Sequence, residues 1–200
     1  MTTIDYYLSL NSPWTFLGAE RFRNHVARHG ARVNVKPARF AEIFSQTGGL
    51  PLPKRAPERQ RYRLMELKRW RDHLGIPIVI EPRHFPSDEV AATRLLIAAA
   101  IAGADALSFS HELGRIVWER EESLADAAAI EAAAVRAHVD LARVKASAPA
   151  DAELDAIWAR NTAEAVERGV FGAPSYVFPD GEIFWGQDRV DFVGRKLANG

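Results

Sequence analysis

The sequence predicts an α/β protein whose four-stranded sheet is split by a helical insertion. Residues 1–40 have the pattern strand–helix–strand, residues 41–150 show little convincing strand, and residues 151–200 read as helix, hairpin and helix. A strand–helix–strand unit normally forms a right-handed parallel crossover. The order therefore predicts a discontinuous domain formed by the two ends of the chain, with an all-helical domain inserted between them.

The first unit has clear boundaries. Residues 3–9 alternate between apolar and polar side chains, as a half-buried strand does. Ser12 is a favourable N-cap and Pro13 suits the first helical position, so a helix is expected to begin there. It should end at Gly30, because glycine adopts the left-handed conformation that closes many helices. Residues 32–38 alternate again and predict the second strand.

The middle of the chain predicts helices separated by glycine and proline. Breaks fall at residues 48–53 and at Gly75-Ile76-Pro77. The helical segments are residues 57–74, 87–102, 104–120 and 123–138. The last of these is rich in alanine, the best helix former. We interpret that composition as close helix packing.

The end of the chain returns to a mixed pattern. Residues 151–168 predict a helix, and residues 175–178 and 182–185 predict two short strands. Pro179-Asp180-Gly181 lies between the strands and indicates a hairpin turn. Residues 187–197 can form a final helix.

Composition excludes several classes of function. The chain has 200 residues, of which 48% are hydrophobic, enough for a packed core. Its 26 basic and 26 acidic residues give a formal net charge of zero, which argues against a general nucleic-acid binder. It has no cysteine, so disulfides, thiolate metal sites, cysteine nucleophiles and Cys-x-x-Cys redox centres are excluded. The histidines show no metal-ligand spacing, and we expect no metal.

The sequence also predicts a cytoplasmic protein without a membrane partner. Residues 1–8 alternate in polarity and do not resemble a signal peptide. The longest apolar stretch, residues 95–102, is far shorter than the roughly 20 residues of a membrane span.

Three short segments carry a resemblance to a known family. They are Ser12-Pro13-Trp14-Thr15, Val170-Phe171-Gly172-Ala173-Pro174 and Trp185-Gly186-Gln187-Asp188-Arg189. In this order they resemble the 2-hydroxychromene-2-carboxylate isomerases, which are related to kappa-class glutathione transferases and to DsbA. The resemblance spans the whole chain. It implies a thioredoxin-like fold with a DsbA-type helical insertion.

The resemblance gives Ser12 a candidate role. Redox enzymes of the superfamily place Cys-x-x-Cys where residues 12–15 stand here. With no cysteine in the chain, glutathione is the implied cofactor, and Ser12 would donate a hydrogen bond to its sulfur. The helix N-terminus favours an anion there. The alternatives are a plain N-cap serine or a serine hydrolase, and the latter lacks a G-x-S-x-G motif.

Two further segments are candidate glutathione contacts. The resemblance implies a cis bond between Ala173 and Pro174, with the Ala173 backbone pairing with the cysteinyl part of glutathione. It also implies capture of the γ-glutamyl end beside Trp185 and Gly186. The Gln187 side chain and helix amides would bind its carboxylate, with the backbone as the alternative contact. Asp188 would pair with its ammonium group.

Asp188 could instead be an ordinary acid in the first turn of a helix. Likewise, Ala173-Pro174 could be an ordinary turn.

The insertion supplies the remaining candidates. The resemblance implies that Lys54 and Arg55 bind substrate and that Arg59 binds the glycine carboxylate of glutathione. His84 could bind a substrate carboxylate or phenol, and Trp14 could stack on an aromatic substrate. The alternative for the basic residues is a solvated surface.

The implied function is a glutathione-dependent isomerase of aromatic compound catabolism. It would interconvert 2-hydroxychromene-2-carboxylate and trans-o-hydroxybenzylidenepyruvate, or a similar aromatic acid, by reversible addition of the glutathione thiolate. A homodimer is implied as well. Two alternatives remain open: a kappa-like glutathione transferase or peroxidase, and a non-catalytic thioredoxin-like module that binds glutathione.

Overall fold

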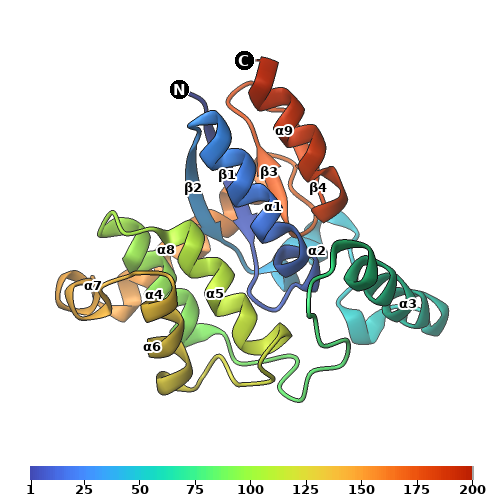
Figure 1. Cartoon of the computed structure of the whole chain (residues 1–200), viewed down its shortest axis with the longest axis horizontal. Coiled ribbons are helices and arrows are strands. Elements are labelled where there is room, and N and C mark those ends of the chain that lie inside the picture. Colours follow the sequence, from blue (N-terminus) through green and yellow to red (C-terminus); the bar gives the residue numbers. More distant parts are fainter. Residues whose placement is uncertain (200) are drawn as a thin grey trace.

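The chain folds around a four-stranded sheet of order β2-β1-β3-β4 (Figure 1). The structure is a computed structural model and describes residues 1–199. β1 (Thr3–Leu8) pairs parallel with β2 (Arg32–Pro37) and antiparallel with β3 (Ser175–Val177). β3 pairs antiparallel with β4 (Ile183–Trp185). The predicted α/β class, the parallel first pair and the C-terminal hairpin are confirmed.

The helix after β1 has the predicted ends. α1 (Pro13–His29) begins after Ser12, whose side-chain oxygen accepts a hydrogen bond of 3.2 Å from the Thr15 N–H. Gly30 ends the helix in the left-handed conformation, at φ 61°, and its N–H donates to the Val26 carbonyl. A residue with a Cβ is disfavoured in that conformation, so glycine sets this boundary.

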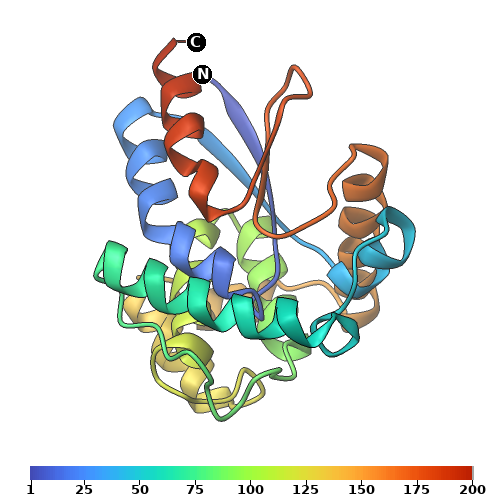
Figure 2. The same ribbon diagram turned by 90° about the vertical axis from the view of Figure 1, so that its right-hand side faces the viewer.

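Helices cover both faces of the sheet (Figure 2). α1 lies beside α9 (Val190–Asn199) on one face. α2 (Phe40–Thr47) lies beside α8 (Asp151–Glu167) on the other. The expected final helix starts as a 3₁₀ turn, Gln187–Arg189, and continues as α9.

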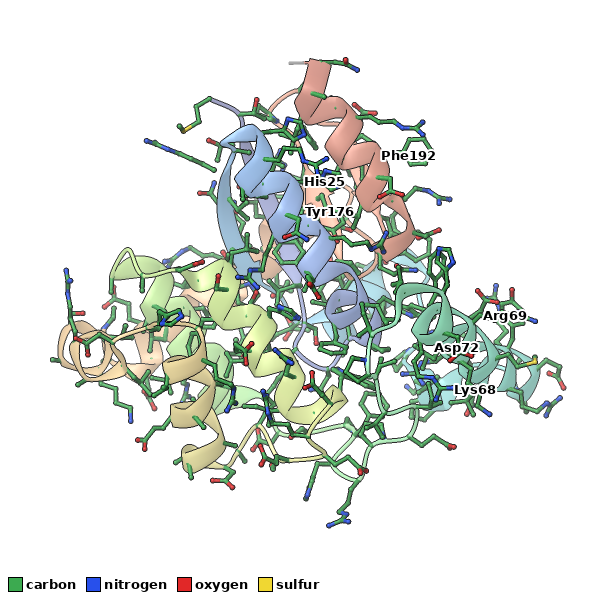
Figure 3. The ribbon with its side chains drawn as sticks, viewed as in Figure 1. His25, Lys68, Arg69, Asp72, Tyr176 and Phe192 are labelled. Carbon is green, nitrogen blue, oxygen red and sulfur yellow. The ribbon has the colours of Figure 1, made fainter. Side chains whose placement is uncertain are left out.

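Each face of the sheet has its own apolar cluster. On the α1 side, Tyr6 stacks on Tyr176 with ring centroids 5.3 Å apart, and Phe22 packs on Tyr176 at 4.5 Å (Figure 3). On the opposite face, Tyr7 and Val177 belong to a second buried cluster, completed by residues of α2 and α8. Strand neighbours point to opposite faces, which explains why Tyr6 and Tyr7 are buried in different clusters.

The insertion is helical, as predicted for the described residues of segment 41–150. After α2 and a 3₁₀ turn (Leu52–Lys54), it contains α3 (Pro57–Leu74), α4 (Val90–Ile101), α5 (Ala106–Trp118), α6 (Ala127–Arg136) and α7 (Leu141–Ser147). A separate α7 was not expected. Its start is set by Asp140, whose carboxylate accepts a 3.0 Å hydrogen bond from the Arg143 N–H.

The helix expected from residue 87 begins only at Val90. Ser87 donates its N–H to the Asn11 side chain at 2.9 Å, and the Glu89 carboxylate accepts from the Asn11 N–H at 3.2 Å. These residues bind the loop after β1, so they are not part of the helix. The division of the chain into two domains at residues 40/41 and 150/151 stays a prediction. Over the described residues, no helix is long and apolar enough to span a membrane.

Candidate functional site

The start of α1 meets the loop before β3. The Ser12 hydroxyl donates a long hydrogen bond, 3.4 Å, to the carbonyl oxygen of Ala173, and the peptide bond between Ala173 and Pro174 is cis. The structure thus brings together two predicted contacts that the sequence separates widely. The Ala173 carbonyl was expected to be free for a ligand, whereas here it already accepts from Ser12.

Two backbone donors at this junction have no acceptor among the described residues. The Thr15 and Phe16 N–H groups bond to the side chain and carbonyl of Ser12. The Trp14 N–H and the Ala173 N–H make no such bond. A helix N-terminus with an unpaired N–H group favours a bound anion.

An aromatic wall borders the junction. Trp185 packs against Phe171 with centroids 4.7 Å apart and is 49% exposed. Its indole lies against Gly172, where a Cβ would come 2.7 Å from the indole Cε2 atom. The Gly186 N–H donates to the Pro174 carbonyl at 2.9 Å, which ties the turn after β4 to the cis-proline loop. We call Ser12, Ala173, Pro174, Trp185, Gly186 and Asp188 the helix-start site.

Gln187 does not fit the expected side-chain role. Its side chain is buried, with 2% of the residue exposed, and its amide oxygen accepts a hydrogen bond from Arg21. Arg21 also donates to the Gln187 carbonyl at 2.7 Å. Gln187 therefore holds the turn before α9 from the protein interior, and its side chain is not available to a ligand.

Asp188 lies at the surface of the same turn. Its carboxylate pairs with the Arg189 guanidinium at 2.7 Å, and both side chains are about half exposed. This placement leaves the carboxylate accessible for an ammonium group.

Arg55, in the basic segment 54–59 of the insertion, packs against Phe44 of α2. The Arg55 guanidinium lies over the Phe44 ring at 5.9 Å, and its Nε–H donates to the Leu50 carbonyl at 2.7 Å. Phe44 and Ala173 pack against the same apolar cluster. Burial and the nearby charge of Arg59 lower the pKa of Arg55. A bound anion would offset both effects.

The remaining candidates are three predicted substrate residues, Lys54, His84 and Trp14, and Arg59, the candidate for the glycine carboxylate of glutathione. Lys54 and Arg59 are exposed and form no ion pair within residues 1–199. His84 is exposed and forms no side-chain hydrogen bond with the part of the chain that the structure describes. Trp14 is half-buried and packs against the main core, which leaves only part of its ring for a ligand.

The partly buried carboxylate of Glu89 binds the loop that precedes α1. Glu89 accepts hydrogen bonds of 3.2 Å from the Ser9 hydroxyl and the Asn11 N–H. Burial raises the pKa of Glu89, and the hydrogen bonds from the loop oppose that rise. The Asn11 amide also donates to the Ser87 carbonyl at 2.9 Å. The insertion therefore fixes the loop that presents Ser12, a role that no local sequence pattern indicates.

Comparisons with known proteins agree with this architecture. The family model described as DSBA-like thioredoxin domain matches residues 3–198. Glutathione S-transferase kappa 1 of Homo sapiens is 27% identical over 211 residues, which cover 98% of this chain and 91% of the relative. The 2-hydroxychromene-2-carboxylate isomerase of Sphingobium xenophagum is 25% identical over 202 residues, which cover 98% of each chain.

A solved structure of a 2-hydroxychromene-2-carboxylate isomerase superposes with a TM-score of 0.77 at 21% identity, covering 98% of this chain and 95% of that one. This likeness confirms the predicted thioredoxin-like fold with a helical insertion.

Proposed function

Because the chain belongs to the family of DSBA-like thioredoxin domains, we propose that it is a glutathione-dependent isomerase of a small aromatic carboxylate. Its relatives include a glutathione transferase of the kappa class and a 2-hydroxychromene-2-carboxylate isomerase. One observation carries the proposal. At the start of α1, where a redox enzyme of this fold needs a thiol, the chain has Ser12 beside the Trp14 N–H, which has no acceptor within residues 1–199.

These residues fit glutathione as a cofactor. Glutathione, when bound, would supply a thiolate that adds reversibly to a conjugated carbon and so permits rotation about the former double bond. The Ser12 hydroxyl and the Trp14 N–H would stabilise the thiolate, because both are donors at the positive end of the α1 dipole. In this role the Ser12 hydroxyl would give up its 3.4 Å hydrogen bond to the Ala173 carbonyl and donate a hydrogen bond to the sulfur instead.

The rest of the cofactor would be held by groups around this point. The Ala173 N–H, which has no acceptor within residues 1–199, would pair with the cysteinyl carbonyl. The exposed Asp188 carboxylate would bind the γ-glutamyl ammonium group, and backbone N–H groups after Gly186 would bind its carboxylate. Arg59 would bind the glycine carboxylate.

The substrate would lie on the insertion side of this site. Lys54 and Arg55 would bind its carboxylate, and the exposed part of the Trp14 ring would contact its aromatic body. His84 would bind a second polar group. A cytoplasmic location and a homodimer belong to the same proposal, and gel filtration of the purified protein tests the dimer.

The decisive assay follows isomerisation of 2-hydroxychromene-2-carboxylate with and without glutathione. We expect activity that requires glutathione and leaves its concentration unchanged. Asp188→Asn should weaken glutathione binding about tenfold, because it removes the charge that faces the ammonium group. Asp72→Asn, at an exposed acid of α3, is the matched control and should bind as the native chain does.

A second candidate is supported by the relative with 27% identity, a kappa-class glutathione transferase. It would use the same site but consume glutathione. Accumulation of a stable conjugate would favour the transferase over the isomerase. Absence of glutathione binding in calorimetry would contradict both enzymes and favour a non-catalytic module.

A further inference from the structure

A pocket of about 450 Å³ lies on the insertion, between the first half of α3 and residues 80–85. Its walls are largely apolar and include Leu52, Leu64, Ile80 and Phe85. The volume lies within the usual range of roughly 300–1,000 Å³ for small-molecule sites. None of the residues proposed above to contact glutathione or its substrate lines this pocket, so it needs an account of its own. We call it the insertion pocket.

Arg63 is the unusual residue of the insertion pocket. It is partly buried and lies over the Phe85 ring, with the guanidinium carbon 5.3 Å from the ring centroid. Within residues 1–199 its guanidinium forms neither a hydrogen bond nor an ion pair. None of its nitrogens is among the fully enclosed polar atoms without a partner, so solvent or a ligand can reach them. A planar fork of N–H donors is therefore available to a carboxylate.

The charge around Arg63 favours an incoming anion. Burial, and second the nearby charge of Arg55, lower the pKa of Arg63 from 12.5 to about 10, and the charge of Glu81 opposes this shift only in part. The neighbouring Arg61 is exposed and already pairs with Glu58 at 3.0 Å. The positive charge of Arg63 is thus incompletely compensated by the protein itself.

Glu81 is an exposed acid that also lines the insertion pocket. It lines the insertion pocket together with Gln60 and Arg63, yet it forms no ion pair with Arg63 within 4.0 Å. Its carboxylate repels a second negative charge on a ligand. Apolar walls, one uncompensated guanidinium and one opposing carboxylate together describe a site for a single negative charge on an apolar body.

We propose that the insertion pocket binds an apolar monocarboxylate, whose carboxylate pairs with Arg63, and that Glu81 excludes dicarboxylates. The inference goes beyond the proposed function, since it needs no glutathione and none of the residues of the helix-start site. Because binding to the insertion pocket is tested without glutathione, a negative result there does not contradict the proposed glutathione-dependent function, and the reverse also holds.

The test titrates the purified protein with 2-naphthoate in the absence of glutathione, by calorimetry. We expect saturable binding that Arg63→Met weakens by about tenfold or more, since it removes a charge-assisted pair of hydrogen bonds. Arg69→Met is the matched control. Arg69 lies on the exposed side of α3, with 61% of its side chain accessible, and pairs with Glu66 (Figure 3). This variant should bind 2-naphthoate as the native chain does.

Two further arms keep the proposal falsifiable if Arg63→Met fails to fold. Arg63→Lys keeps the positive charge but loses the planar pair of N–H donors, so it should weaken binding of 2-naphthoate several-fold. Glu81→Gln should raise affinity for naphthalene-2,6-dicarboxylate several-fold while changing 2-naphthoate less. No saturable binding at millimolar 2-naphthoate would overturn the proposal. So would equal affinity for 2-naphthol, or an equal loss in the Arg63 and Arg69 variants.

Discussion

The Ser12 hydroxyl oxygen lies 3.4 Å from the Ala173 carbonyl oxygen, although 161 positions separate the two residues in the chain. The same hydroxyl oxygen accepts the Thr15 N–H at 3.2 Å and so caps α1. Ser12 thus joins the first helix to the cis-proline loop. At 3.4 Å the hydrogen bond to Ala173 is weak, so the Ser12 hydroxyl can donate instead to a better acceptor placed beside it at small cost.

Ser12 should contribute separately to stability and to function. Ser12→Ala removes the cap and should lower the free energy of unfolding by about 1 kcal/mol. Ser12→Asp keeps a capping oxygen, so its stability should change by only a few tenths of a kcal/mol. Its negative charge should nevertheless repel a thiolate and abolish glutathione-dependent turnover. Urea unfolding and steady-state kinetics on both variants measure the two effects. Full activity in Ser12→Asp would contradict the proposed role.

Arg21 should act as a positioning residue for the turn before α9. Arg21→Met removes the donor to both oxygens of the buried Gln187, and unpaired buried acceptors cost about 1–3 kcal/mol. Because the same turn presents Asp188, KM for glutathione should rise while kcat changes little. Arg28→Met, at an exposed position of α1, should cost less than about 1 kcal/mol and leave KM unchanged. Equal effects of the two substitutions would contradict the prediction.

Gly172 should be intolerant of a side chain, because an added Cβ overlaps the Trp185 indole. Gly172→Ala should destabilise the chain by about 1–3 kcal/mol, as overpacking does, and change the Trp185 fluorescence. Gly114→Ala is the opposite case. Its Cβ would meet Phe16 at 3.5 Å, an ordinary contact, and alanine in a helix should add about 0.5–1 kcal/mol of stability. Thermal unfolding of the two variants should therefore shift in opposite directions.

His111 should make stability depend on pH. It is buried in α5, and its Nδ1 atom lies 3.2 Å from an Arg23 nitrogen. Burial first, and Arg23 second, lower the pKa of His111 from 6.5 to about 4. Between these values the unfolded chain binds the proton and the folded chain does not, so stability falls as the pH falls from 6.5 to 4.

For His111 this loss should reach about 2 kcal/mol between pH 7 and pH 5. Urea unfolding at the two pH values measures it. His111→Gln removes the titrating group, so the pH dependence of its unfolding free energy should be smaller by that amount. An unchanged slope in the variant would show that His111 is not responsible.

Much of the fold was predictable because its signals are local. Ser12 and Gly30 mark the two ends of α1 through capping chemistry that involves only neighbouring residues. The alternation in residues 3–9 and the Pro-Asp-Gly turn likewise predict the strands and the hairpin. The start of α4 was not predictable, because Ser87 and Glu89 are held by Asn11, more than 70 positions away in the chain.

The candidate site was predictable only in part. The family resemblance indicated Ser12 and Ala173, and the structure places them in contact. The inward turn of Gln187 depends on Arg21, which stands 166 positions earlier and carries no motif. Arg63 looked like any other charge of α3, and only the folded chain shows that its guanidinium has no partner within residues 1–199. Tertiary contacts decide such roles, so a pattern along the chain does not reveal them.

The central claim is that the start of α1 holds a thiolate that the chain itself lacks. Its most direct test is a pH titration of the ultraviolet thiolate absorbance of glutathione bound to the protein. We predict a thiol pKa below about 7.5, against about 8.5 for a free thiol, with a return toward the free value in Ser12→Ala. A bound thiol that titrates like free glutathione, or glutathione that does not bind at all, would contradict the account.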